Sequence, residues 1–417
     1  MENKKLLILG GTQISLQILK AAKEMGLDVY VTDYYEDSPC KKFADKSFMV
    51  SATDVSRVVK LIEDENIDGV LMGYADVLMP YYNEICLKAG LPCYSNMEAI
   101  DVTTDKARFK QYCKKFNIPT VAEYSLADVK NGNAQYPLIV KPVDNSGARG
   151  IYICHNISEF EKNFEKALSY SKSKNVIIER LMTSGEATIF YYLHRGEVYL
   201  LGVADRWMYE QDKSVLKLPV GYTFPARNIE KFLRDQDKDI KNMFKSLNMK
   251  EGMVFMQSFV EDGKYIIYEM GYRLTGSIEH HLMDAAYGFN HLKKIISFAV
   301  GNEVDTQNLS KLNPSKCCMA NITFLLKEGT ISKIKGLEQL AAEPYVASWH
   351  ISHNEGDSIT SENIGRLSQV GLRVLILADN YSQLLSRMDE IKDLVEIADE
   401  SGNDMIIRNY SYTELCK

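Results

Sequence analysis

The residues best suited to chemistry lie in one segment near the middle of the chain, Gln257–Arg273. Alternating apolar residues on both sides of Glu261-Asp-Gly-Lys264 predict a β-hairpin, because Asp-Gly is typical of tight turns. On this hairpin Gln257 and Glu269 face the same side. Burying an unpaired carboxylate is costly, and a divalent metal ion is one partner that would offset the cost. The alternative is an edge hairpin with a solvated Glu269 and Arg273 in an ordinary salt bridge.

A lysine ends another predicted strand. Lys141 closes the apolar run that begins at Tyr136, and a polar loop follows it. Such a loop can approach phosphates through backbone N–H groups at its glycines, and it can close over them to exclude water. The alternative is an ordinary hairpin with a surface lysine. The loop residues suited to holding phosphate are Ser146, Gly147, Arg149 and Gly150.

Three further acidic residues lie at the ends of predicted strands. Glu179 closes the apolar run from Asn175, and a connecting strand there can offer backbone groups to an adenine, while Glu186 can accept from ribose hydroxyls. Purely structural strand-end carboxylates are the alternative for both. Asp76 follows the strand Gly69–Met72 at its carboxyl end, where open α/β sheets bind ligands. Aspartate is also a good helix N-cap, and the two roles are compatible.

Three further residues are candidates for binding an acceptor substrate. Arg206 follows a predicted strand and suits a carboxylate, although a solvated arginine beside a packed Trp207 is the alternative. His280 and His281 come soon after the hairpin and can line an acceptor site. Adjacent histidines also occur as surface residues where a helix begins.

Composition and charge narrow the class of protein. The chain has 417 residues, of which 46% are hydrophobic and 25% charged, as in soluble globular proteins. The net charge of −7 argues against a nucleic-acid partner. No apolar run reaches membrane-spanning length, and the first residues are too short and strand-like for a signal peptide. The 8 cysteines lack CxxC pairs, which favours reduced thiols and a cytoplasmic location.

The pattern of elements predicts three units of mixed α/β and α+β class. Residues 1–103 alternate strands and helices as a parallel α/β sheet does, and their GGTQIS turn is not the GxGxxG of a dinucleotide site. Residues 104–303 form the central unit, with a smaller subdomain at about 118–182. Residues 304–417 form a small α+β unit. We also expect a polar loop over 206–225, single helices over 229–247 and 284–300, a short strand over 92–94, and strands 317–326 and 331–336 meeting at a turn.

The order of these signals along the chain resembles the ATP-grasp superfamily, and most of all its carboxylate–amine ligases. That group includes L-amino acid ligases, purine-synthesis enzymes, and carbamoyl-phosphate synthetase and biotin carboxylase domains. The resemblance implies an ATP-grasp fold, with a pre-ATP-grasp domain before it and a C-terminal cap after it. It also implies ATP and Mg²⁺, or Mn²⁺, as cofactors. The implied roles are Lys106 and Lys141 on phosphates, Glu179 and Leu181 on adenine, Glu186 on ribose, Gln257 and Glu269 on magnesium, and Arg273 on the transferred phosphoryl group.

The segment departs from the family pattern at two positions. The usual E-x-N-x-R is here Glu269-Met-Gly271-Tyr-Arg273, so one metal-ligand side chain is absent. Gln257 stands where a carboxylate is common. Magnesium keeps several waters readily, so neither change abolishes metal binding.

The leading hypothesis is therefore a ligase that activates a carboxylate as an acyl-phosphate and joins it to an amine or related nucleophile. The first alternative is a nucleotide-binding regulatory protein without catalysis. The second is a bicarbonate-using carboxylase, although residues 273–281 depart from the RxQVEH run of biotin carboxylases. The expected partners are small molecules, with neither nucleic acid nor membrane, and a homodimer is compatible with them.

Overall fold

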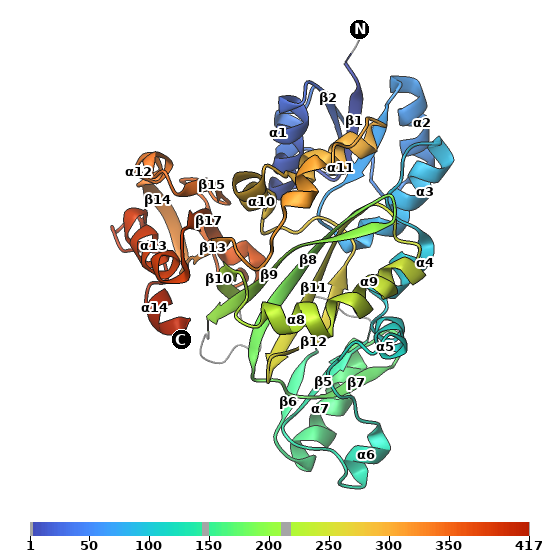
Figure 1. Cartoon of the computed structure of the whole chain (residues 1–417), viewed down its shortest axis with the longest axis vertical. Coiled ribbons are helices and arrows are strands. Elements are labelled where there is room, and N and C mark those ends of the chain that lie inside the picture. The colour runs from blue at the N-terminus through green and yellow to red at the C-terminus, as the bar shows by residue number, and fades with distance from the viewer. Residues whose placement is uncertain (1–2, 144–149, 210–217, 417) are drawn as a thin grey trace.

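The structure is a computed structural model that describes residues 3–143, 150–209 and 218–416. A parallel four-stranded sheet in the order β3-β2-β1-β4 forms the N-terminal unit, at the top of Figure 1. Its inner strand β1 and its neighbour β4 contain buried runs such as Leu6–Leu9, as expected of a parallel sheet covered by helices, whereas the edge strand β3 is largely exposed. The predicted α/β alternation is confirmed. The elements are β1 Lys5–Leu9, α1 Leu16–Glu24, β2 Asp28–Thr32, β3 Lys46–Phe48, α2 Val55–Glu65, β4 Gly69–Met72, α3 Met79–Ala89 and α4 Met97–Thr104.

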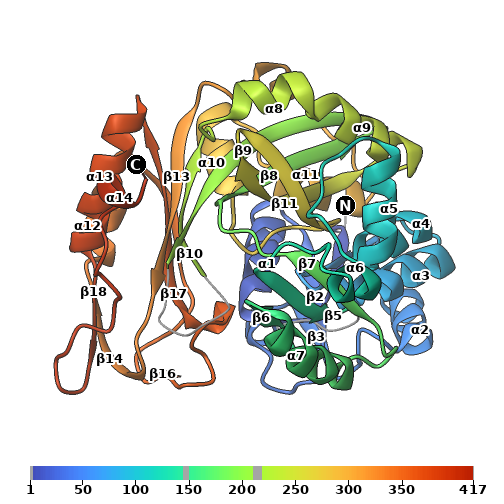
Figure 2. The same cartoon turned by 90° about the horizontal axis from the view of Figure 1, so that it is seen from below.

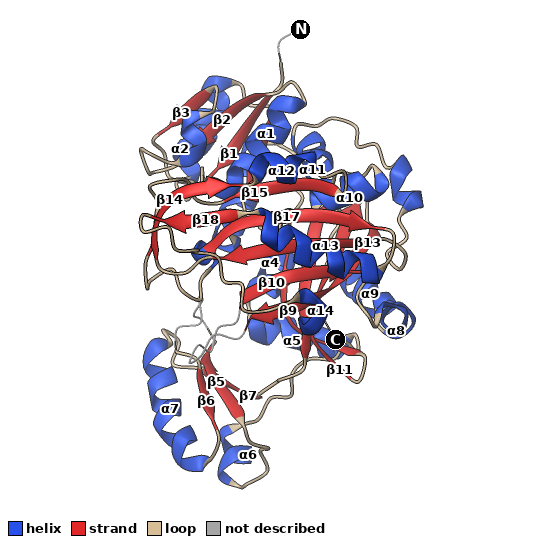
Figure 3. Ribbon diagram, turned by 90° about the vertical axis from the view of Figure 1, so that its left-hand side faces the viewer, coloured by secondary structure: helices blue, strands red, loops and turns tan. Residues whose placement is uncertain are grey.

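A small three-stranded sheet in the order β6-β5-β7 projects from the body of the molecule, as Figure 3 shows. One face of it packs Leu138, Val140 and Ile178 against α7 and the residues of α6. Its other face carries Lys141 and Glu179. The elements of this part are α5 Lys106–Lys115, α6 Leu126–Lys130, β5 Leu138–Pro142, β6 Tyr152–Cys154, α7 Ile157–Tyr170 and β7 Val176–Arg180.

The largest sheet has eight strands in the order β12-β11-β8-β9-β10-β13-β17-β15. The sheet continues across the expected boundary between the central and C-terminal units at residue 304, because β10 pairs antiparallel with β13. The central and C-terminal units therefore share one sheet (Figure 2). The central elements are β8 Gly185–His194, β9 Glu197–Tyr209, β10 Leu218–Phe224, α8 Ile229–Asp235, α9 Asp237–Ser246, β11 Gly252–Glu261, β12 Lys264–Gly271, α10 His280–Tyr287 and α11 His291–Ala299.

The C-terminal strands enter two different sheets. Strands β13, β17 and β15 extend the large sheet, and α13 covers one face of them through Leu384, Met388 and Ile391. Strand β14 instead joins the small sheet β16-β14-β18. The elements are β13 Cys318–Leu325, β14 Gly329–Lys335, α12 Leu337–Ala342, β15 Val346–Ile351, β16 Ser358–Ile359, β17 Val370–Ala378, α13 Tyr381–Leu394, β18 Glu396–Asp399 and α14 Tyr412–Leu415.

Five local predictions were wrong. Residues 218–224 are strand β10 rather than loop, and residues 92–94 form no strand. Strands β13 and β14 do not pair with each other. The helix expected over 229–247 breaks at Gln236, whose amide side chain bonds both backbone groups of Tyr265. The helix expected over 284–300 is α10 and α11, separated at Gly288, which adopts a left-handed conformation.

Candidate active site

The hairpin predicted around Gln257 and Glu269 is present. Asp262 and Gly263 both have positive φ, 51° and 72°, which is the geometry of a two-residue type I′ turn. Gln257 lies directly opposite Glu269 on the paired strands β11 and β12. The pairing skips Tyr268, so this bulge sets the register that brings the two side chains together.

The expectation of a buried carboxylate was wrong, because Glu269 is exposed, and its carboxylate forms no ion pair among the described residues. A carboxylate oxygen and the amide oxygen of Gln257, side by side on one face, fit the oxygen ligands that Mg²⁺ prefers. The described residues contain no group of three or more His, Cys, Asp or Glu side chains able to hold a metal ion. The hairpin would thus supply two protein ligands, with waters and phosphate oxygens as the remainder.

The absent metal ligand at Gly271 has a structural counterpart in Phe255. The two residues are a cross-strand pair, and a Cβ added at Gly271 would lie 2.2 Å from Cε1 of the Phe255 ring. The same ring lies 5.0 Å from the guanidinium carbon of Arg273. The aromatic ring therefore occupies the space that an asparagine at position 271 would need, and it supports Arg273 from one side.

Arg273 is held in a bidentate ion pair by Asp76. Its Nε and Nη2 donate to the two carboxylate oxygens, each at 2.7 Å, and its Nη1 donates to the Leu274 carbonyl at 2.8 Å. The Arg273 side chain is 15% exposed, whereas Asp76 is 46% exposed. Asp76 makes no N-cap hydrogen bond at the 3₁₀ turn it begins. The carboxyl end of β4 thus meets the end of the hairpin, as a shared site requires.

Two lysines converge on Glu179. Lys110 on α5 forms a close ion pair with Oε1 of Glu179, and Lys141 on β5 forms one with Oε2. Lys110 also forms an ion pair of 2.6 Å with Glu123. Burial would raise the pKa of Glu179, but Lys141 and Lys110 outweigh burial and hold that pKa below its usual value. Glu179 is 3% exposed, so it positions the two lysines. Sequence reasoning missed Lys110, although it lies one helical turn after Lys106.

The Leu181 amide, expected beside an adenine, donates to the Pro137 carbonyl at 3.0 Å, so it is not free in this arrangement.

Lys106 begins α5 and completes the cationic group. Burial lowers the pKa of its ammonium, Lys141 lowers it further, and Glu269 and Glu179 oppose the shift. Lys106 is therefore within electrostatic reach of both Lys141 and Glu269. Of the phosphate loop, Ser146, Gly147 and Arg149 lie outside the described residues. Gly150 has φ of +79° and packs closely against Pro142 and Tyr170.

Glu186 and Arg206 form an ion pair of 2.7 Å on adjacent strands, and Tyr268 Oη bonds both of them. Glu186 lies opposite Phe259 on β11, and Phe259 is two residues from Gln257 on the same strand. Glu186 and its cross-strand partner Arg206 are therefore on the same face of the sheet as Gln257. Tyr268 was missed from sequence, because only the bulge turns it to this side. Arg206 is not solvated, and the neighbouring Trp207 packs in the core on the opposite face.

His280 and His281 are packed against each other at the start of α10, with ring centroids 4.2 Å apart. His280 is 4% exposed, and burial lowers its pKa well below the usual value. His281 bonds Gln17 of the N-terminal unit at 3.1 Å. The surface alternative is therefore wrong for His280, which packs against His281 and His291, whereas the half-buried His281 reaches the N-terminal unit through Gln17.

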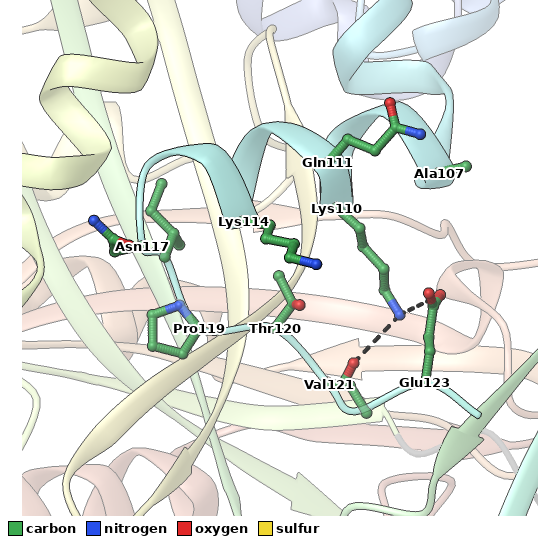
Figure 4. A pocket seen from close by; sticks show the side chains of 10 residues that line it. Ala107, Lys110, Gln111, Lys114, Asn117, Pro119, Thr120, Val121 and Glu123 are labelled. Atoms are coloured by element: carbon green, nitrogen blue, oxygen red, sulfur yellow. Dashed lines mark hydrogen bonds and ion pairs between the residues drawn. The ribbon is translucent and has the colours of Figure 1, made fainter. Parts of the chain in front are cut away.

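A shallow pocket of about 620 Å³ lies along the outer side of α5, between Lys114 and the strand-like segment at Thr120 (Figure 4). Lys110 crosses it to reach Val121 and Glu123. The pocket borders the site described above through Lys110 and Glu123, but Gln257, Glu269 and Lys141 do not line it. None of the helices in the described part of the chain is long and apolar enough to cross a membrane.

The sequence and the fold resemble those of known proteins. Residues 134–280 match the family model of the ATP-grasp domain. A formate-dependent phosphoribosylglycinamide formyltransferase from Sulfolobus acidocaldarius is 28% identical over 216 residues, which are 49% of this chain and 53% of that protein. The chain thus spans about half the length of this curated relative.

Two solved structures resemble nearly the whole chain. Phosphoribosylglycinamide synthetase from Anaerococcus prevotii has a TM-score of 0.76 at 21% identity, over 96% of this chain and 100% of that one. L-amino acid ligase from Bacillus licheniformis has a TM-score of 0.75 at 18% identity, with the same coverage. The chain has the ATP-grasp fold, and its residues 134–280 match the ATP-grasp domain.

Proposed function

We propose that this protein is an ATP-dependent ligase that activates a carboxylate as an acyl-phosphate and joins it to an amine or related nucleophile. The observation that carries the proposal is that Lys106 on α5 lies near both Lys141 on β5 and Glu269 on the hairpin, with Arg273 just beyond the end of that hairpin. The names of the relatives support it, because synthetase and ligase describe the joining of two molecules, and the formyltransferase depends on formate, which is a carboxylate.

The chemistry requires activation because a carboxylate has a poor leaving group. Transfer of the terminal phosphoryl group of ATP to a carboxylate oxygen gives an acyl-phosphate and ADP. An amine then attacks the acyl carbon, and inorganic phosphate leaves. Catalysis of such transfers consists mainly of positioning and of neutralising charge.

The residues divide this work between them. Lys141, fixed by Glu179, and Lys106 would bind phosphate oxygens as point charges. Arg273 would donate to the oxygens of the phosphoryl group in transfer, with its orientation preset by Asp76. Magnesium, held by Glu269 and Gln257, would supply further positive charge beside the phosphates.

One observation favours a second candidate, a nucleotide-binding protein without catalysis. The ring of Phe255 fills the place of a metal-ligand side chain, and loss of a ligand is one route by which activity disappears. Both candidates predict binding of ATP. Only the ligase predicts that adding a carboxylate causes ADP formation.

The test is ADP and phosphate release in the presence of ATP and Mg²⁺ with a panel of carboxylates, bicarbonate included. The expected result is release that depends on one carboxylate class and falls sharply in Lys141→Ala. Arg366→Ala, a change at an exposed residue of the C-terminal unit, is the control. ATP binding without release for any carboxylate would instead support the regulatory candidate.

A further inference from the structure

A group of buried polar residues lies on the face of the large sheet that carries the candidate active site. We name it the arginine cluster; its members are Arg206, Tyr222, Glu279, Asn321 and Arg373. Cross-strand register places them together: Arg206 lies opposite Tyr222, and Tyr222 opposite Asn321. Arg373 lies opposite Thr323, two residues beyond Asn321 and hence on the same face. Helix α10, which follows Glu279, packs over β17 on this face.

Arg373 is a buried cation that has no carboxylate within ion-pair distance among the described residues. It is 7% exposed and its Nη1 donates to Thr323 Oγ1 at 2.8 Å, but it forms no ion pair among the described residues. Burial lowers the pKa of its guanidinium, and nearby Arg206 lowers it further, while Tyr222 and Glu279 oppose the shift. A buried charge of this kind costs several kcal/mol unless an anion accompanies it.

Three other members of the cluster also carry a buried polar atom without a hydrogen-bond partner among the described residues. They are Nε of Arg206, Oδ1 of Asn321 and Oε1 of Glu279. The other polar side-chain atoms of Asn321 and Glu279 have partners. Asn321 donates to the Ser277 carbonyl at 2.6 Å, and Thr275 bonds the other oxygen of Glu279.

Buried polar atoms are almost always satisfied in folded proteins, so several unsatisfied ones in one place indicate a missing molecule. Tyr74 of the N-terminal unit interacts electrostatically with Glu279, and its hydroxyl is likewise unpartnered among the described residues. Glu279, Asn321 and Tyr74 therefore bring together parts of all three units.

The segment between the active site and the cluster has free space beside it. Gly276 lies between Arg273 and Glu279, and a Cβ added at Gly276 would meet no atom within 4 Å. Gly276 and Ser277 are both partly exposed, whereas Glu279 is 1% exposed. A small molecule could therefore approach the cluster along this segment from the side of Arg273.

We propose that the arginine cluster recognises a small ligand that carries an oxyanion beside a hydrogen-bond donor such as an amine. Arg373 binds the oxyanion, and the free oxygens of Asn321 and Glu279 accept from the donor. Arg206 contributes its Nε from the active-site side, because its Nη1 is already paired with Glu186. The inference rests on the proposed ligase function and assigns to it the site that selects one of the two substrates.

The experiment uses L-α-amino acids as probes, each compared with the amine and the carboxylic acid that lack its other group. Thermal melting of the full chain with Mg²⁺ and a non-hydrolysable ATP analogue measures binding without turnover. At least one amino acid should raise the melting temperature of the wild type, and neither of its two counterparts should match it. If no probe stabilises the wild type, or if the amine or the acid alone does so equally, the proposal is overturned.

The decisive variant is Arg373→Met, with Arg387→Met on α13 as control. Arg387 belongs to the same unit but contacts Tyr345 and the Leu377 carbonyl, away from the cluster. Arg373→Met should abolish the melting shift and raise the KM for the probe about 10- to 100-fold, as expected for losing a hydrogen bond to a charged group. The affinity for the ATP analogue should not change. Because the free protein loses an unpaired buried charge, its own melting temperature should not fall.

A merely structural Arg373 would give the opposite pattern, a lower melting temperature with an unchanged KM, and would sink the proposal. The two proposals fail in different ways. Carboxylate-dependent ADP formation with an unaltered KM in Arg373→Met would remove the cluster and leave the ligase. Melting shifts that depend on Arg373, without ADP formation from any carboxylate, would leave the cluster and remove the ligase.

Discussion

Asp76 and Arg273, which are 197 residues apart in sequence, form a bidentate ion pair with both N–O distances at 2.7 Å. The pair ties the carboxyl end of a parallel strand in the N-terminal unit to the end of the hairpin that carries Glu269. Asp76 remains 46% exposed, so the pair lies at the edge of the site rather than inside the core. It fixes the direction of the guanidinium before any phosphate arrives.

Arg273→Ala should lower carboxylate-dependent turnover by about 10²-fold or more, the scale of losing one preorganised donor to the transition state. ATP affinity should change far less, because Lys106 and Lys141 remain. Asp76→Asn keeps the guanidinium but weakens its orientation, so turnover should fall by a smaller factor. Steady-state phosphate release beside calorimetric ATP binding measures both effects. Full turnover in Arg273→Ala would show that the arginine is only a structural partner of Asp76.

Lys141→Ala should weaken ATP binding, because it removes a cation that Glu179 holds at the end of β5. Glu269→Ala should instead remove the dependence of that binding on magnesium, since it deletes the carboxylate that faces Gln257. Calorimetric titrations with and without Mg²⁺ separate the two effects. Glu261→Ala is a suitable control, because it alters a carboxylate of the same hairpin that pairs with Arg180 instead. Wild-type affinity and metal dependence in both variants would refute the assignment.

Gly271→Ala should destabilise the protein by about 1–3 kcal/mol, the usual cost of overpacking. The reason is steric, because the added Cβ would lie 2.2 Å from the Phe255 ring. Gly276→Ala is the matched control: its Cβ would meet no atom within 4 Å, and its stability should be nearly unchanged. Chemical denaturation of both variants gives the comparison. Equal stability of the two would mean that the ring of Phe255 moves aside at little cost.

The pH dependence of ATP binding should report Lys106. Because burial lowers the pKa of Lys106, its ammonium loses its proton at a lower pH than an ordinary lysine, whose pKa is about 10.4. ATP affinity should therefore weaken as pH rises through this lowered value. Between the two pKa values the unfolded chain binds more protons at this site than the folded chain, so the contribution of Lys106 to stability rises with pH.

Lys106→Arg is the matched variant for this measurement, because arginine keeps its charge throughout the range. Its ATP affinity should stay flat from neutral to alkaline pH while that of the wild type declines. Parallel declines in the two proteins would assign the titration to another group.

The sequence alone determined those features that depend on local pattern. Asp262-Gly263 required positive φ at two successive residues, so the turn and the facing strands could be read directly. Local pattern also predicted the lysine at the end of β5 and the alternation of strands and helices over residues 1–103. The order of these signals was enough for the resemblance to the ATP-grasp superfamily.

The tertiary structure decided what distant segments do to one another. No local pattern shows that Asp76 reaches Arg273, or that Glu179 lies between Lys110 and Lys141. The bulge at Tyr268 changes which side chains share a face, and the loss of a single residue from the pairing register cannot be seen in hydrophobic alternation. Arg373 looks in sequence like one charge within an apolar strand. Only the pairing of β13 with both β10 and β17 buries it beside Arg206 and Glu279, because side-chain burial is set by the sheet as a whole.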